Sequence, residues 1–296
     1  MLMIKPPPFT SGKKIGIVAL AGPLDQRLLL RGEDYLKQLG FDVLIAPSCF
    51  KQLGYLAGEN DAERALDLKM LFVDDEIGAI INMRGGYGSN RIMPYLKDFN
   101  FAKYPKPFIG YSDITYIHIY LNQQHQLITY HGPMVKDLLK NVQLTTASFI
   151  NTCLNGDVLT LDHISFLGNK KQQITGRTVG GNLSIIASTI GTPYEIDTKG
   201  KILFLEEVNE ANYSLDRLLM QLSYAGKLDE CAGIILGDFN GAHRQSLLAT
   251  VKQVLLPTKK AIAYNVAAGH TSPNISIPLG AQCRFDVLAK QLIFLE

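Results

Sequence analysis

The chain has 296 residues, 47% of them hydrophobic and 19% charged, so it can form one large or two medium globular domains with a buried core. Its formal net charge of +2 and its dispersed Lys and Arg residues exclude the basic surface that a nucleic-acid partner requires. Four widely spaced cysteines without a C-x-x-C pair argue against a zinc site or a disulfide framework, and no apolar run reaches the ~18 residues of a membrane span.

The first half of the chain alternates strands and helices. Apolar runs predict five strands, at residues 14–20, 41–46, 77–83, 106–111 and 127–131. Helical spacing of apolar residues predicts three helices between them, at 24–39, 61–73 and 113–123. Such an alternation implies a parallel sheet covered on both faces, so we predict an α/β domain at residues 1–140. Ligands bind these sheets beyond the carboxyl ends of the strands.

The pattern changes near residue 141. We interpret 141–160 as a connecting segment, with a helix at 145–154, and 161–296 as a β-rich second domain. Short β-rich runs predict strands at 158–164, 172–179, 201–208, 231–238, 275–279 and 287–295. Three helices are predicted among them, at 182–189, 215–225 and 244–256. The pattern does not determine the strand order of this domain.

Ser112 is the first candidate nucleophile, because it lies where a short apolar strand ends and a helix begins. A serine on such a turn projects its hydroxyl above the sheet edge, and the first helical N–H groups, beginning with that of Asp113, face a developing oxyanion. The alternative is that Ser112 only caps the helix. The segment lacks the second glycine of the G-x-S-x-G elbow of α/β-hydrolases.

The loop after the third strand, Arg84-Gly85-Gly86-Tyr87-Gly88, is a candidate anion site. Its glycines let the backbone present N–H groups to a ligand at close range, and Gly85 or Gly86 could supply an oxyanion donor. Arg84 could hold a substrate carboxylate with two hydrogen bonds. The loop matches neither G-x-G-x-x-G nor a P-loop, and a nucleotide cradle and a simple tight turn both stay open as alternatives.

A serine nucleophile needs a base. Two of the six histidines, one at a predicted strand end and one in a loop, could reach the same cleft as the serine. His131 ends the fifth strand, and His270 lies in a loop bounded by Gly and Pro. We favour His270, because its loop can direct an imidazole across a cleft between two domains. The other histidines are expected to be surface or packing residues: His118, His125, His163 and His243.

The base needs a carboxylate to orient it, and the run 201–208 ends in two acids. Alternation along a strand places Glu206 and Glu207 on opposite faces, so only one can point into a given cleft. Glu206 is the stronger candidate, and Asp238, at the end of the 231–238 run, is an alternative.

Six motifs in chain order carry a family resemblance: Arg84-Gly-Gly-Tyr-Gly88-Ser-Asn-Arg91, Ile109-Gly-Tyr-Ser112-Asp-Ile-Thr115, His131-Gly-Pro-Met134, Gly180-Gly-Asn-Leu183, Phe204-Leu-Glu206-Glu207, and Gly269-His270 with Pro278-Leu-Gly280. Together they resemble the LD-carboxypeptidases, also called muramoyltetrapeptide carboxypeptidases, a family of serine peptidases. The resemblance implies a flavodoxin-like or Rossmann-like N-terminal domain and a β-rich C-terminal domain. It also implies a triad of Ser112, Glu206 and His270.

By the same resemblance the substrate is murein tetrapeptide, from which the family removes the terminal D-alanine during cytoplasmic recycling of cell-wall fragments. The substrate carboxylate would be bound by Arg84, with Arg177 and Arg217 as alternatives. A sister branch, similar to microcin C self-immunity proteins, cleaves aminoacyl or peptidyl adenylates and stacks the base on a tryptophan. This chain contains no Trp, which favours the carboxypeptidase branch.

A non-catalytic nucleotide- or sugar-phosphate-binding protein is the alternative from a different class, with the 85–88 loop as its site. We expect no metal and no other cofactor, because the sequence has no H-E-x-x-H or C-x-x-C motif. We also expect a cytoplasmic protein with reduced thiols and no nucleic-acid or membrane partner. A homodimer is a hypothesis, since the sequence leaves the oligomeric state open.

Overall fold

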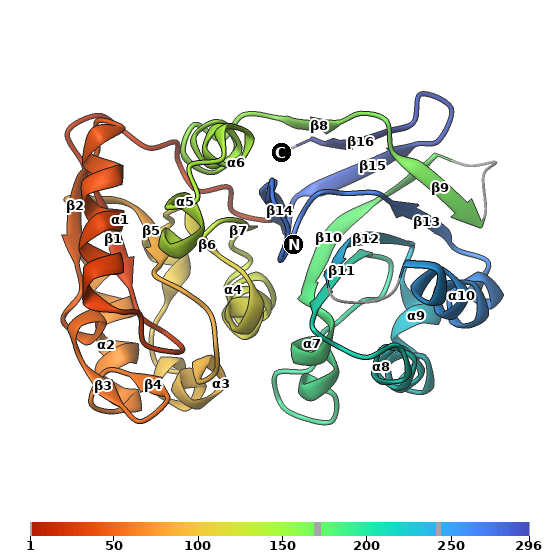
Figure 1. Ribbon diagram of the computed structural model, residues 1–296, viewed down its shortest axis with the longest axis horizontal. Coiled ribbons are helices and arrows are strands. Elements are labelled where there is room, and N and C mark those ends of the chain that lie inside the picture. Colours follow the sequence, from red (N-terminus) through yellow and green to blue (C-terminus); the bar gives the residue numbers. More distant parts are fainter. Residues whose placement is uncertain (1, 169–172, 241–243, 296) are drawn as a thin grey trace.

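The computed structural model describes residues 2–168, 173–240 and 244–295. It contains two large sheets, side by side in Figure 1, one formed mainly by the first half of the chain and the other by the second half. The predicted fold class is confirmed: a parallel α/β domain is followed by a strand-rich domain.

The first sheet has the order β14-β7-β6-β5-β1-β2 and is parallel except for the β14–β7 pair. Its strands are β1 (Lys14–Val18), β2 (Asp42–Ile45), β5 (Ile77–Asn82), β6 (Phe108–Gly110), β7 (Thr129–His131) and β14 (Ile277–Leu279). A two-stranded hairpin of β3 (Gln52–Leu53) and β4 (Leu56–Ala57) lies outside it. All five strands predicted for this half are confirmed, each one to three residues shorter at one or both ends than expected.

Helices pack around this sheet through buried apolar side chains, and the two longest of them also begin with a side-chain cap. The Asp25 carboxylate accepts hydrogen bonds from the first N–H groups of α1, and Asn60 does the same for α2. The helices are α1 (Gln26–Gln38), α2 (Asp61–Val73), α3 (Ser89–Ile92), α4 (Thr115–His125), α5 (Val135–Leu138) and α6 (Gln143–Ser148). Short 3₁₀ turns lie at Pro47–Phe50, Met93–Leu96, Phe101–Lys103 and Ser112–Ile114, and a π-helical turn at Phe149–Leu154.

The second sheet has the order β8-β16-β15-β10-β11-β12-β13-β9, parallel at its centre from β10 to β13 and antiparallel on both sides. Its strands are β8 (Leu159–Leu161), β9 (Ser165–Gly168), β10 (Ile174–Asn182), β11 (Ile202–Val208), β12 (Gly233–Asn240), β13 (Ala261–Tyr264), β15 (Gln282–Asp286) and β16 (Gln291–Phe294). The helices of this half are α7 (Leu183–Thr189), α8 (Asn212–Tyr224), α9 (Lys227–Glu230) and α10 (Arg244–Val254), with a 3₁₀ turn at Leu256–Thr258.

Three strands of the second half were missed or misread from the sequence. The sequence pattern did not predict β9 or β13, and the expected single run at 287–295 is instead the end of a β15–β16 hairpin. Leu288 lies in the turn of that hairpin and is 95% exposed. Its apolar side chain extended the apolar pattern of the sequence beyond the actual strand. The strand predicted at 172–179 starts at residue 172, which lies outside the described residues.

The segment predicted as a strand at 275–279 forms β14, but it does not join the second sheet. It pairs antiparallel with β7 at the edge of the first sheet, with Pro278 opposite Tyr130. A proline is tolerated there because an edge strand has one side without a hydrogen-bonded neighbour. The chain therefore crosses back from the second domain to the first just after the loop that carries His270.

Each sheet has its own buried core. One cluster of apolar side chains lies between the first sheet and its helices, and two clusters lie on the faces of the second sheet. Among the described residues no helix is both long and apolar enough to cross a membrane.

All four cysteines are buried and unpaired: Cys49, Cys153, Cys231 and Cys283. Burial raises the pKa of Cys153 and of Cys283 to about 12, so these thiols stay protonated at neutral pH.

Because all four thiols are buried, we expect none of them to react with a thiol reagent within minutes at pH 8 in the native protein. After denaturation all four should react. Rapid reaction of even one thiol in the native protein would contradict this packing.

Candidate active site

Ser112 lies at the carboxyl end of β6, in the first position of the 3₁₀ turn that leads into α4. Its φ of +64° is in the left-handed region, which residues with a side chain rarely adopt. Neither the turn nor α4 begins with a side-chain capping hydrogen bond, so the capping alternative for Ser112 is not observed. Strained backbone of this kind concentrates at functional sites, where the surrounding structure holds it in place.

The loop after β5 packs directly against this serine. A Cβ built on Gly85 would lie 2.9 Å from the Ser112 Cβ and 3.0 Å from its Oγ, so only glycine allows this approach. The Ser89 N–H donates to the Asp113 carboxylate (2.8 Å), and the Ser89 hydroxyl donates to the Asp113 carbonyl (2.5 Å). Burial raises the pKa of Asp113, and the hydrogen bonds from Ser89 oppose that shift. The loop and the serine turn are therefore held together.

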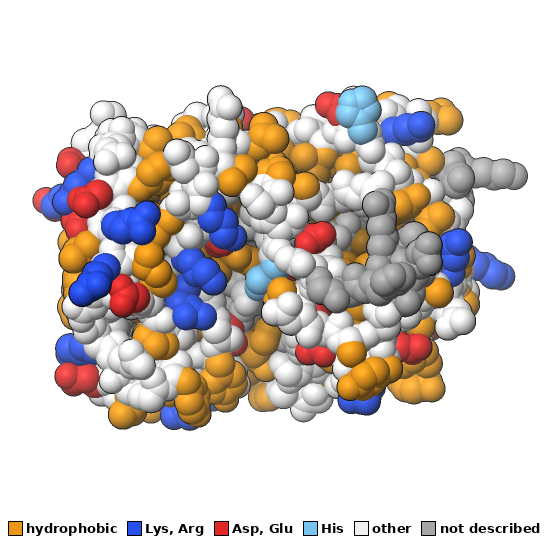
Figure 2. Space-filling model, in the orientation of Figure 1, with side chains coloured by type: hydrophobic (Ala, Val, Ile, Leu, Met, Phe, Trp, Pro, Cys, Tyr) orange, Lys and Arg blue, Asp and Glu red, His pale blue; other side chains and the backbone are white. Residues whose placement is uncertain are grey.

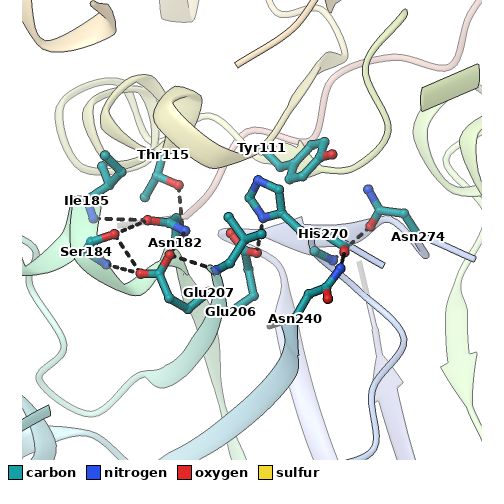
Figure 3. A network of polar contacts seen from close by, with 12 residues as sticks. Tyr111, Thr115, Asn182, Ser184, Ile185, Glu206, Glu207, Asn240, His270 and Asn274 are labelled. Carbon is teal, nitrogen blue, oxygen red and sulfur yellow. Dashed lines mark hydrogen bonds and ion pairs between the residues drawn. The ribbon is translucent and has the colours of Figure 1, made fainter. Parts of the chain in front are cut away.

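Glu206 and His270 form a direct pair. The His270 Nδ1 lies 2.7 Å from the Glu206 Oε2, the carboxylate is fully buried and the imidazole side chain is 20% exposed (Figure 3). Burial raises the pKa of Glu206, while the hydrogen bond and the charge of His270 lower it. With Nδ1 bonded to the carboxylate, Nε2 is the ring nitrogen that can exchange a proton with a third group.

Three hydrogen bonds hold the loop that carries His270. The Asn240 side-chain amide donates to the His270 carbonyl (2.9 Å), and the Gly269 N–H donates to the Asn274 side-chain oxygen (2.9 Å). The Asn274 N–H in turn donates to the Thr145 hydroxyl of α6 (2.9 Å). The backbone of the loop that carries the imidazole is therefore fixed by β12 and by α6.

Tyr111 connects the serine to the pair. Its ring centroid lies 4.8 Å from that of His270, and its hydroxyl donates to the buried Asp137 carboxylate (3.1 Å). Because Tyr111 immediately precedes Ser112, its packing on His270 puts the serine turn in the neighbourhood of the Glu206–His270 pair. Asp238 lies on β12, and among the described residues it forms no hydrogen bond with His270; burial raises its pKa, and the charge of His270 acts to lower it.

His131 lies beneath this site rather than in it. It is fully buried, packs against Tyr111 and Phe204, and neither ring nitrogen has a hydrogen-bond partner among the described residues. Burial, and then the charges of the neighbouring His118 and His270, lower the pKa of His131 well below its ordinary value. A buried imidazole of such low basicity is a poor proton acceptor.

The remaining histidines have structural or surface positions. His118 is buried with both ring nitrogens bonded, to Thr129 and to the Gly110 carbonyl, and burial lowers its pKa to about 4. His125 is half-buried and packs against Phe101, and His163 is exposed. His243 lies outside the described residues.

Glu207 points to the other face of β11 and forms a separate buried network (Figure 3). Its carboxylate accepts hydrogen bonds from the Asn182 side chain (2.9 Å) and from the N–H (2.8 Å) and hydroxyl (2.6 Å) of Ser184. The Asn182 backbone N–H donates to the Thr115 hydroxyl (3.1 Å), three residues beyond Ser112. A buried carboxylate of the second domain thus anchors the segment that contacts the start of the serine helix.

The three arginines considered for a substrate carboxylate lie in different places. Arg84 precedes Gly85, donates to the carbonyls of Gly85 and Pro23, and lines a surface cavity of about 570 Å³. Arg177 lines a different cavity, and Arg217 lies on α8 over the ring of Tyr213. Among the described residues, no group of three or more His, Cys, Asp or Glu side chains is arranged to hold a metal ion.

Several residues that shape the site were not singled out from the sequence. Gly269 has a φ of +112°, and a Cβ there would lie 2.6 Å from the Glu206 Oε2. In the sequence, only its position next to His270 could have indicated that Gly269 lies at the site. Thr115 and Asn182 were quoted within motifs, but their contact joins residues far apart in the chain and has no local signature. The same holds for Asn240 and Asn274.

Comparison with known proteins matches both halves of the chain to one family. Residues 15–132 match the LD-carboxypeptidase N-terminal domain, and residues 175–285 match the LD-carboxypeptidase C-terminal domain. A probable murein peptide carboxypeptidase of Bacillus subtilis (strain 168) is 36% identical, over 99% of this chain and 94% of its own length.

Solved structures agree with this fold over nearly the whole chain. The muramoyltetrapeptide carboxypeptidase from Oxalobacter formigenes superposes with a TM-score of 0.85 at 25% identity, covering 96% of this chain and 99% of its own. A microcin C7 self-immunity protein superposes with a TM-score of 0.87 at 23% identity, covering 100% and 99%. The latter likeness shows the shared fold.

Gly269→Ala should be strongly destabilising, because its Cβ would meet the Glu206 carboxylate and its φ is unfavourable for alanine. We expect a loss of about 3 kcal/mol in the free energy of unfolding, measured by urea titration. Gly191→Ala is the matched control: its φ is +79°, but nothing lies within 4 Å of the added Cβ, so the loss should be about 1 kcal/mol. Equal losses would contradict the close approach of Gly269 to Glu206.

Proposed function

This chain belongs to the LD-carboxypeptidase family of serine peptidases, and we propose that it removes the terminal D-alanine of murein tetrapeptide through an acyl-enzyme on Ser112. The chain is accordingly a hydrolase. The observation that supports the proposal is the 2.7 Å contact between Glu206 and His270, together with the packing of Tyr111, the residue before the strained Ser112, on the His270 ring. Nucleophile, base and orienting carboxylate are the three parts that acyl transfer by serine requires.

In the proposed reaction, Glu206 holds the proton of His270 on Nδ1 and leaves Nε2 free to accept the Ser112 hydroxyl proton. The alkoxide attacks the scissile carbonyl, and the imidazolium then protonates the departing amine of the D-residue. Water, deprotonated by the same imidazole, hydrolyses the acyl-enzyme. The buried position of Glu206 supports this role, because a carboxylate without competing water interacts strongly with an imidazolium.

Two backbone amides are proposed as oxyanion donors. The Asp113 N–H follows the serine on the first helical turn, and the Gly85 or Gly86 N–H belongs to the loop that touches the Ser112 side chain. Donors of this kind contribute about 2.7–4 kcal/mol each to transition-state stabilisation in other acyl-transfer enzymes.

Arg84 is proposed to bind the free carboxylate of the D-alanine. The support is that Arg84 lines a surface cavity next to the loop in which Gly85 packs against Ser112. Two of its nitrogens already donate to backbone carbonyls, which orients the guanidinium plane.

The substrate assignment rests on the 36% identity with the Bacillus subtilis protein, whose name describes murein peptide cleavage. We accordingly propose a cytoplasmic role in cell-wall recycling. The alternative is cleavage of aminoacyl or peptidyl adenylates, as in the microcin C branch. Measuring hydrolysis of murein tetrapeptide and of an aminoacyl adenylate by the same enzyme distinguishes the two functions. A homodimer remains a hypothesis.

Ser112→Ala and His270→Ala should each lower turnover of murein tetrapeptide by about 10⁴-fold, because members of such a triad act as a unit. The double variant should be scarcely worse than either single one. Mass spectrometry for loss of one alanine measures turnover, and a fluorophosphonate should label Ser112 in the unmodified enzyme.

His131→Ala serves as the comparison for the base. We expect it to fold less stably, because it leaves a cavity beneath Tyr111, but to keep more activity than His270→Ala. If His131→Ala were inactive and His270→Ala active, the assignment of the base would be overturned. Near-normal turnover by Ser112→Ala would overturn the assignment of Ser112 as the nucleophile.

Amidation of the terminal carboxylate should remove most activity toward the tetrapeptide, because the proposed Arg84 contact needs a negative charge. Arg84→Ala should raise KM for the free acid and leave the rate for the amide unchanged. Arg217→Ala, which removes an exposed arginine on α8, is the control for net charge. Rapid hydrolysis of the amide by the unmodified enzyme would argue against a carboxylate clamp.

A further inference from the structure

The surface cavity of about 570 Å³ that Arg84 lines is formed by the segments that follow three neighbouring strands of the first sheet. These strands, β5, β1 and β2, are adjacent and parallel. Pro23 follows β1, Tyr55 lies in the β3–β4 hairpin after β2, and Arg84 and Tyr87 follow β5. Parallel α/β sheets bind ligands at this edge, beyond the carboxyl ends of their strands. The position of the cavity is therefore that of a ligand site.

Gly85 connects this cavity to the proposed nucleophile. Its neighbours Arg84 and Gly86 line the cavity, while Gly85 itself is buried against the Ser112 side chain. The Gly22 N–H donates to the Gly85 carbonyl (3.2 Å), and Gly22 also lines the cavity. Consecutive Cα atoms are about 3.8 Å apart, so the cavity begins one residue away from the glycine that touches the serine. A peptide whose scissile carbonyl is at Ser112 is therefore long enough to place its next residue at the cavity.

Two exposed tyrosines line the cavity. The ring centroids of Tyr55 and Tyr87 lie 5.8 Å apart with 58° between the ring planes, and the two residues are 64% and 46% exposed. Hydrophobic side chains, a colour class that includes Tyr, lie along the lower edge of the first domain in Figure 2, where Figure 1 places β3, β4 and α3. Arg84 is the single charged residue among the described residues that line the cavity. Aromatic rings beside one cation suit a ligand that combines a carboxylate with an apolar ring.

The cavity is much larger than the side chain of alanine. With the carboxylate of the departing residue at Arg84, a methyl group would leave both tyrosine rings in water. Ligand cavities of about 300–1,000 Å³ bury most of the surface of the ligand that they bind. An aromatic side chain buries about 150–250 Å² and packs against other rings in tilted arrangements. The size and the lining of the cavity therefore favour a ring on the departing residue.

We propose that this cavity is the subsite of the departing residue, and that the enzyme removes terminal D-residues with an aromatic side chain as well as D-alanine. The inference rests on the proposed function, because it takes Ser112 as the point of cleavage and Arg84 as the contact of the terminal carboxylate. The reaction is the same hydrolysis. The peptide bond breaks, the imidazolium protonates the departing amine, and one water supplies the hydroxyl group of the new carboxyl terminus.

The test compares tetrapeptides that differ only in the fourth residue, D-phenylalanine or D-alanine, with mass spectrometry of the released amino acid. The unmodified enzyme should cleave the D-phenylalanine peptide with a kcat/KM about tenfold above that of the D-alanine peptide. Combining Tyr55→Ala with Tyr87→Ala should reduce this preference to about twofold or less, whereas Tyr55→Phe with Tyr87→Phe keeps both rings and should keep the preference. Tyr224→Ala, which removes an exposed tyrosine at the end of α8, is the control and should also keep it.

Calorimetry on Ser112→Ala gives a second readout, which does not depend on turnover. The D-phenylalanine peptide should bind about tenfold more tightly than the D-alanine peptide, and the two Tyr→Ala changes on this background should remove the difference. Cleavage of the D-alanine peptide without a preference for the aromatic residue, or an unchanged preference in the Tyr→Ala variant, would overturn the subsite and leave the proposed function standing. Preferred binding of the aromatic peptide without cleavage of either peptide by the unmodified enzyme would instead overturn the proposed function and leave the subsite.

Discussion

Two consecutive carboxylates at the end of β11, Glu206 and Glu207, are almost completely removed from water, and the rest of the site depends on how the fold compensates them. Alternation along the strand sends them to opposite faces. One meets the imidazole of His270, and the other meets the amide and hydroxyl groups of Asn182 and Ser184 (Figure 3). An uncompensated buried carboxylate would cost several kcal/mol, so both sets of partners must be in place for the second domain to pack.

These partners also join the two domains. Asn182 contacts Thr115 at the start of α4, and the His270 loop reaches α6 through Asn274 before the chain enters the first sheet as β14. The unfavourable φ of Ser112 is maintained by this surrounding structure, since Gly85 packs against the serine and the preceding Tyr111 is held by its contacts with His270 and Asp137. Compensation of buried charge and positioning of a reactive hydroxyl are thus achieved by the same contacts.

Much of the architecture could be predicted from local pattern. The parallel sheet of the first half followed from alternating apolar runs and helical spacing. Helix α2 has the predicted bounds, and Asn60 caps its start. The second half was harder to predict, because β9 and β13 are short and β14 leaves its own domain. Strand pairing across more than a hundred residues has no local signature, so Ile277–Leu279 could be recognised as a strand but not assigned to a sheet.

By itself, the sequence determined that Ser112 follows a short strand, that Glu206 and Glu207 face opposite ways, and that His131 and His270 were the histidines to consider. These conclusions depend on backbone periodicity and on the residues next to each position. Only the tertiary structure decided that His270 meets Glu206 while His131 is buried beneath Tyr111, and that Asp238 lines a cavity instead of pairing with the imidazole. Those outcomes depend on how two separately formed sheets pack against each other, which short-range spacing does not specify.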